Sequence, residues 1–154
     1  MSNRTLVLGI GSPIMCDDAI GLRVLQELSK RGVQGVDLQE ACTSGLDLIE
    51  IMLDYDRVIV VDAILKSSQK PGTIMVLDPE AFSNTVHGVN PHEANVATTI
   101  ELGRSLEPDR FPKKIIFVAV EVNDVFTVSE SMTPEVEAAL EGTVQKVLEL
   151  ISGA

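Results

Sequence analysis

Short runs of aliphatic residues alternate with amphipathic segments along the 154-residue chain. Three runs have the composition of strands buried on both faces, and they lie at Thr5–Ile10, Arg57–Asp62 and Ile115–Val120. Two weaker strands are predicted at Val36–Ala41 and Thr73–Leu77. Strands that alternate with helical segments are typical of an α/β fold built on a parallel sheet.

Helical periodicity follows most of these strands. Helices are predicted from near Asp18 to about Arg31, over 46–53, over 92–106, and from Pro134, which stands at a first helical position. The link before the strand at 73–77 is too short for a crossover helix, so that strand is expected to pair antiparallel to its predecessor or to leave by a hairpin. Residues 78–91 are predicted to form a long loop.

The predicted fold is a single three-layer α/β/α domain over residues 1–154. Its sheet should be twisted and mostly parallel, with about five strands, one of them antiparallel. The core must be aliphatic, because the chain has no Trp, one Tyr and four Phe.

The charge balance limits the classes of partner. Twelve Lys and Arg face 23 Asp and Glu, a net charge of −11, which argues against nucleic acid and against insertion at an anionic membrane surface. Cys16 and Cys42 lack metal-site spacing and are expected to be free thiols. The first apolar segment is too short for a signal sequence or a membrane span, so a cytoplasmic protein is predicted.

Three polar residues are expected where strands or loops end: Asp18, Asp62 and His92. In open α/β sheets, ligands bind beyond the carboxyl ends of the strands. Two carboxylates and an imidazole that converge there would suit Ni²⁺, Zn²⁺ or Fe²⁺, or acid/base chemistry. Each also has a structural interpretation: Asp17 or Asp18 as a helix-start residue, Asp62 in a turn, and His92 at an exposed helix start.

Several familiar site motifs are absent or incomplete. The turn Gly9-Ile-Gly11 resembles the start of a dinucleotide fingerprint, but Ile14 stands at its third glycine and two carboxylates follow. The sequence contains no P-loop, H-E-x-x-H or G-x-S-x-G pattern. A nucleotide, zincin or serine-hydrolase site is therefore not predicted.

Residues 9–21 (GIGSPIMCDDAIG) resemble the G-x-G-N-x-L-x-x-D-[DE]-x-x-G start of the [NiFe]-hydrogenase maturation endopeptidases. Further segments are similar to that family at Val60–Ala63, Asn90–His92, Phe111–Lys114 and Met132–Val136. The chain departs from the family at Ser12, where Asn is usual, at Ala19, and at residues 40–43, which replace a D-G-G-T loop.

The resemblance implies an endopeptidase that removes the C-terminal extension of a [NiFe]-hydrogenase large-subunit precursor after nickel insertion. It implies that Asp18, Asp62 and His92 are the catalytic residues and bind the nickel. The nickel would arrive with the substrate precursor, and no intrinsic organic cofactor is expected. Nickel would supply Lewis-acid assistance, with Asp17 or Glu93 in a supporting or proton-handling role.

Two other functions stay open from the sequence. One is a non-catalytic binding module, or chaperone, for a metallated partner. The other is a peptidase of the same fold that acts on a different precursor.

Overall fold

A five-stranded sheet in the order β2-β1-β3-β5-β4 forms the centre of the molecule. The computed structural model describes residues 3–65, 67–86 and 91–153. The strands are β1 (Thr5–Ile10), β2 (Asp37–Ala41), β3 (Arg57–Leu65), β4 (Ile74–Leu77) and β5 (Lys114–Val122). Only β4 runs antiparallel to its neighbour among these strands. The predicted fold class is confirmed.

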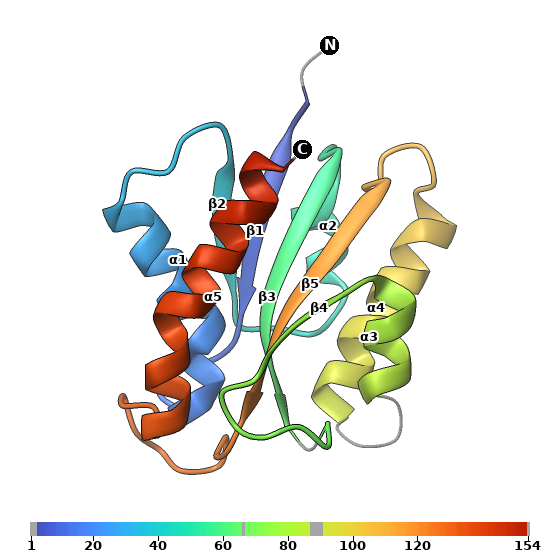
Figure 1. Cartoon of the computed structure of the whole chain (residues 1–154). Helices are drawn as coiled ribbons and strands as arrows, with labels where there is room; N and C mark the ends of the chain where they lie inside the picture. Colours follow the sequence, from blue (N-terminus) through green and yellow to red (C-terminus); the bar gives the residue numbers. More distant parts are fainter. Residues whose placement is uncertain (1–2, 66, 87–90, 154) are drawn as a thin grey trace.

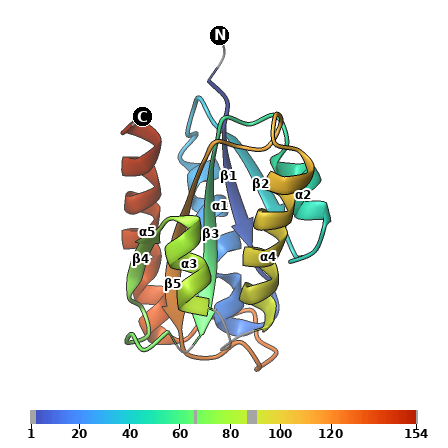
Figure 2. The ribbon, with the colours of Figure 1, turned by 90° about the vertical axis from the view of Figure 1, so that its right-hand side faces the viewer.

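Helices cover both faces of the sheet, as Figure 1 and the perpendicular view in Figure 2 show. They are α1 (Ile20–Lys30), which follows the short 3₁₀ helix η1 (Cys16–Ala19), α2 (Asp47–Met52), α3 (Pro79–Val86), α4 (Pro91–Leu106) and α5 (Pro134–Ser152). Apolar residues of α1 and α5 pack on one face, and those of α2, α3 and α4 pack on the other. Among the described helices, none combines the length and the apolar character needed to cross a membrane.

The alternation of side chains in β3 assigns its residues to the two cores. Ile59 and Val61 belong to the core beneath α1 and α5, whereas Val60 and Ile64 belong to the core beneath α2, α3 and α4. By the same alternation, the side chain of Asp62 lies on the face of the sheet beneath α2, α3 and α4, together with those of Val60 and Ile64. A carboxylate therefore stands where an aliphatic side chain would complete the core.

Two sequence predictions about β3 and β4 were wrong. Asp62 does not end a strand, because β3 continues to Leu65 and pairs along its whole length with β5. The antiparallel strand β4 pairs with β5 rather than with its predecessor. After β4 the chain crosses over through α4 and forms β5 between β3 and β4. The shortness of the link between β3 and β4 could not indicate that a later strand would lie between them.

The long loop predicted at 78–91 was also wrong, because Pro79–Val86 forms α3. The carboxylate of Asp78 accepts a hydrogen bond from the Ala81 N–H at 2.8 Å, and Pro79 occupies the first helical position. Phe82 is fully buried and stacks on Phe117, with ring centroids 3.8 Å apart. Residues 87–90 of the predicted loop, including Asn90, lie outside the described residues.

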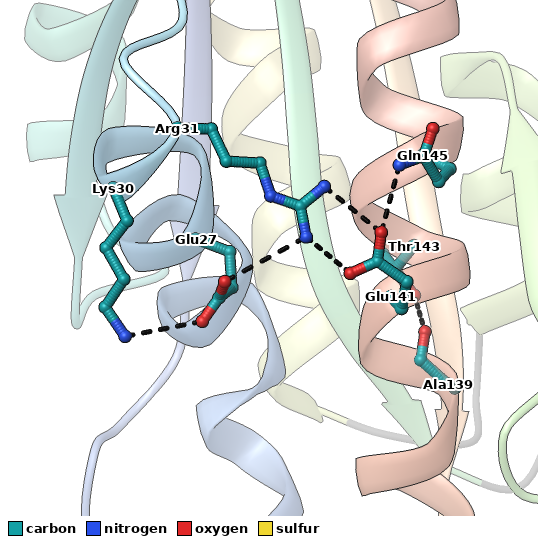
Figure 3. Close-up of polar contacts among 7 residues, drawn as sticks. All are labelled: Glu27, Lys30, Arg31, Ala139, Glu141, Thr143 and Gln145. Atoms are coloured by element: carbon teal, nitrogen blue, oxygen red, sulfur yellow. Dashed lines mark hydrogen bonds and ion pairs between the residues drawn. The ribbon is translucent and has the colours of Figure 1, made fainter.

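Ion pairs join the solvent-exposed sides of α1 and α5 (Figure 3). Arg31 donates hydrogen bonds to both carboxylate oxygens of Glu141 and also lies 4.0 Å from Glu27. Gln145 donates a further bond to Glu141 at 3.0 Å. Since these groups are all at least partly accessible to water, the network contributes little to stability, and the buried cores hold the two helices on the sheet.

Candidate metal and catalytic site

The strand order creates a topological switch point between β1 and β3. β1 has β2 as its outer neighbour, at one edge of the sheet. β3 has β5 as its outer neighbour, toward the opposite edge. The last pair that joins β1 to β3 is Gly9 with Val61, so Asp62 lies one residue beyond this pair while its strand continues. The carboxyl ends of these strands and the first turn of α4 lie together at the lower edge of the sheet in Figure 1. Ligands of open α/β sheets bind at such a point.

Asp62, His92 and Glu93 form a compact cluster at this edge. One donor atom from each lies within 4.8 Å of the other two. Asp62 is 0% exposed and Glu93 is 3% exposed. These donors are two carboxylates and an imidazole, a set that suits a divalent transition metal.

One oxygen of each buried carboxylate has no hydrogen-bond partner among the described residues. Asp62 Oδ1 accepts from the Ala63 N–H at 2.9 Å, but Asp62 Oδ2 and Glu93 Oε2 accept none. Leaving a buried carboxylate oxygen without a partner is costly in free energy. The cluster is therefore built as if a further positive or hydrogen-donating group completes it.

The electrostatics of the cluster agree with this interpretation. Burial, followed by the charges of Glu93 and Asp18, raises the pKa of Asp62 well above its ordinary value. Burial, with a smaller contribution from Asp18, raises the pKa of Glu93 to about 7. Burial lowers the pKa of His92. At neutral pH the imidazole is therefore in the neutral form that can bind a metal.

Asp18 borders the cluster from η1 on the other side of the switch point. Its carboxylate is half-buried, and burial raises its pKa to about 6, against a backbone hydrogen bond from Ser12. The Gly11 turn sets the position of η1, because a Cβ at Gly11 would lie only 2.0 Å from the Asp18 carbonyl oxygen. The glycine thus allows η1 to pack closely on β1, which explains it without a nucleotide phosphate.

Asp17 is fully buried and has a structural role. Its carboxylate accepts hydrogen bonds from the N–H groups of Asn123 and Asp124, both at 2.9 Å, and of Thr133 at 2.6 Å. The Thr133 hydroxyl donates to it as well. The sequence interpretation of Asp17 as the cap of its own helix was wrong, since neither η1 nor α1 has a side-chain cap. Asp17 instead ties η1 to the loop between β5 and α5.

The fold brings Asp18, Asp62 and His92 to one edge of the sheet, and metal binding by them stays a prediction. Sequence reasoning gave Glu93 only a supporting role, although the structure places it inside the cluster. In the sequence, the position of Glu93 next to His92 could have indicated a role at the site. Its burial could not be predicted, because the helix that carries it is mostly polar. Cys16 is buried, and burial and the neighbouring Asp17 raise its pKa, which disfavours a reactive thiolate.

Comparison with known sequences gives consistent results. The family model described as hydrogenase maturation protease (HycI) matches residues 22–150. The hydrogenase 2 maturation protease of Escherichia coli is 32% identical over 148 residues, which cover 94% of this chain and 88% of that protein. The hydrogenase expression/formation protein HupD of Bradyrhizobium diazoefficiens is 27% identical over 154 residues, covering 97% and 79%.

Comparison with solved structures supports the same relationship. The hydrogenase maturating endopeptidase HybD from E. coli superposes with a TM-score of 0.84 at 29% sequence identity. The match covers 97% of this chain and 93% of that one. The similarity thus extends over the whole sheet and both helical layers.

Proposed function

Because the chain belongs to the hydrogenase maturation protease family, and is therefore a peptidase, we propose that it removes a C-terminal extension from a [NiFe]-hydrogenase large-subunit precursor after nickel insertion. The nickel is part of the substrate, and Asp18, Asp62 and His92 recognise it. The observation that carries this proposal is the fully buried Asp62: its Oδ2 has no partner among the described residues, and its carboxylate belongs to the cluster with His92.

The donor set fits nickel. Ni²⁺ accepts imidazole and carboxylate ligands together, and a precursor would add its own thiolates. Asp62 and His92 supply one donor of each kind within 4.8 Å. Burial and, after it, the charges of Glu93 and Asp18 raise the pKa of Asp62, and the charge of a bound cation would relieve this repulsion.

Each residue has a task that follows from its position. Asp62 lies within β3, where it is fully buried, and its Oδ2 accepts no hydrogen bond from the described residues. His92, kept neutral by burial, contributes a ring nitrogen to the cluster from the first turn of α4. Asp18 approaches from η1 on the far side of the switch point. Carboxylate and imidazole donors on three separate elements can orient a bound substrate centre far better than one flexible loop.

A substrate-borne nickel ion would supply Lewis-acid polarisation of the scissile carbonyl. The chain's own residues anchor this centre, fix the direction of the extension and exclude competing water through burial. Recognition of the nickel before cleavage would also explain why the enzyme cuts only a nickel-loaded precursor.

Two loops that are hydrogen-bonded to each other carry exposed apolar side chains, which fit a polypeptide substrate. Ile14, Phe126 and Val128 are 50%, 76% and 74% exposed, and we call these three side chains the apolar rim. The Ser129 N–H donates to the Ile14 carbonyl at 2.9 Å, and the Cys16 N–H donates to Ser129 at 3.0 Å, so the two loops that carry the rim are joined. Clustered exposed apolar residues mark interaction surfaces.

The proposal places the reaction in the cytoplasm, where reduced cysteines are the rule. Both Cys16 and Cys42 are free thiols.

The test uses purified chain with nickel-loaded and nickel-free large-subunit precursor, and mass spectrometry of the precursor C-terminus. We expect shortening of the loaded precursor alone, and none with Asp62→Ala or His92→Ala, although both variants keep the fold by circular dichroism. A stable complex without shortening would indicate a binding module instead. Shortening by Asp62→Ala at the wild-type rate would refute the site.

A further inference from the structure

Glu93 occupies an unusual position for a glutamate. It lies in the first turn of α4, where acidic residues are commonly exposed, yet it is only 3% exposed. Its Oε2 has no hydrogen-bond partner among the described residues. The carboxylate accepts a hydrogen bond from the backbone N–H of Glu93 itself, but this bond leaves Oε2 without a partner among the described residues, and that needs a further physical reason.

The distances within the cluster point to a shared ligand. Donors bound to one transition metal at about 2.0–2.2 Å lie roughly 3–4 Å apart. The donor atoms of Asp62, His92 and Glu93 already lie within 4.8 Å of one another, so a small contraction would place them around one ion. Asp18 stands outside this group of three.

The charges point to a cation rather than to a hydrogen-bond donor from the protein. The groups that shift the pKa of Glu93 and of Asp62 include other carboxylates and no lysine or arginine. Three carboxylates therefore lie at one edge of the sheet. Among the described residues, no lysine or arginine lowers the pKa of Asp62 or of Glu93.

We propose that Glu93 is a fourth ligand of the divalent cation, so that the chain offers three carboxylates and one imidazole. The inference rests on the proposed function in that the natural cation is the nickel of the precursor. It adds one consequence: with four donors, the isolated chain binds Ni²⁺ even without a precursor. Glu93 touches the metal, and Asp18, Asp62 and His92 complete the set.

The experiment is a calorimetric titration of Ni²⁺ into the full chain, prepared without a histidine tag. Glu93→Gln keeps the shape of the side chain and removes its charge, and we expect its Ni²⁺ affinity to fall by about tenfold or more. The matched control is Glu101→Gln on the same helix, whose side chain is exposed and which should bind Ni²⁺ like the wild type.

A second readout separates ligation from a merely structural role. Without metal, Glu93→Gln should melt at a higher temperature than the wild type, because it removes a repelling charge. Added Ni²⁺ should then raise the melting temperature of the wild type more than that of the variant. Equal Ni²⁺ affinity in wild type and Glu93→Gln would overturn the inference, and so would a lack of Ni²⁺ binding by the wild type. Failure of the wild type to cut a precursor would overturn the proposed function alone.

Discussion

Two buried aspartates, Asp17 and Asp62, differ in how the fold completes them. Both are 0% exposed. Asp17 accepts hydrogen bonds on both oxygens from three backbone N–H groups and the Thr133 hydroxyl. Among the described residues, Asp62 accepts only the bond from the Ala63 N–H, and it lies near the charges of Glu93 and Asp18. Burial alone does not distinguish a structural carboxylate from a functional one. The distinction lies in whether the protein itself supplies hydrogen-bond donors to both carboxylate oxygens.

The comparison separates the effects of substitution at these two positions. A carboxylate that is completed by the protein contributes to folding, whereas one left incomplete lowers stability in exchange for binding a ligand. Asp17 should therefore be important for stability, and Asp62 for activity.

Asp62→Asn should nearly abolish processing of a nickel-loaded precursor. We expect a loss of more than about 100-fold, because even residues one step removed from a metal contribute 10–100-fold. The substitution removes a charge that repels Glu93 and Asp18, so the free energy of unfolding should not fall. Cleavage rates by mass spectrometry and urea unfolding of the same sample measure both quantities. A variant that is inactive because it is unfolded would contradict the comparison.

Asp17→Asn should give the opposite result, with a large loss of stability. The amide N–H₂ group would face backbone donors of Asn123, Asp124 or Thr133, so at least one strong hydrogen bond would become a clash of donors. We expect a decrease of roughly 3 kcal/mol in the free energy of unfolding, since bonds to charged groups contribute 1.5–3 kcal/mol each. Urea unfolding measures it. A loss below about 1 kcal/mol would show that Asp17 is not the structural partner in the comparison.

The sequence predicted the fold better than it predicted the environment of individual carboxylates. Aliphatic runs located β1, β3 and β5, because strands buried on both faces have a characteristic composition. The prediction of a loop at 78–91 missed α3, because its local signals, Asp78 and Pro79, are brief and the stacking of Phe82 on Phe117 is a tertiary contact that the sequence does not show. The position of β4 beside β5 also depends on a strand formed later in the chain.

At the site, the sequence indicated Asp18, Asp62 and His92 but did not show which neighbours would complete them. Asp17 and Asp18 are adjacent and identical in type, yet the loop between β5 and α5, more than 100 residues later, binds only Asp17 through its N–H groups. The burial of Glu93 depends on how α4 docks against the sheet. Such pairings between distant segments have no local signature in a single sequence.

Phe126→Ala tests whether the apolar rim binds the precursor. Because Phe126 is 76% exposed, its removal should not alter stability, but it should raise KM by about tenfold if the ring becomes buried in the complex. The turnover number should stay constant, since the ring does not belong to the metal cluster. Steady-state kinetics on loaded precursor give both values. Leu106→Ala is the control. Leu106 is exposed at the last residue of α4, whereas the metal cluster lies at its first turn, so this substitution should leave KM unchanged.

The stability of the metal-free protein should fall as the pH rises from about 6 to 8. In the folded chain burial raises the pKa of Glu93 to about 7, and it also raises the pKa of Asp62 well above its ordinary value. The unfolded carboxylates have already lost their protons at pH 6, so the folded state alone releases protons in this window. Stability gained by holding these protons is lost as the pH rises.

For Glu93 the loss amounts to roughly 1 kcal/mol over this window. Asp18, with a pKa of about 6, adds to it in the lower half. His92 has a lowered pKa and acts in the opposite sense, but only below its ordinary value near 6.5. Urea unfolding at several pH values measures the slope. Asp62→Asn should reduce it, and a wild-type stability that increases over this window would contradict the prediction.

Glu141→Gln provides the smallest expected effect and the most direct check on the role of burial. Glu141 accepts bonds from Arg31 on both oxygens and from Gln145, so both of its carboxylate oxygens have partners, like those of Asp17 (Figure 3). Its side chain, however, is 62% exposed, and water can replace each partner that is lost. If the number of hydrogen bonds determined stability, Glu141→Gln would destabilise the chain as much as Asp17→Asn. Because desolvation determines it, the melting temperature of Glu141→Gln should match that of the wild type within error. A decrease comparable to that of Asp17→Asn would show that partner number, and not burial, explains the behaviour of Asp17.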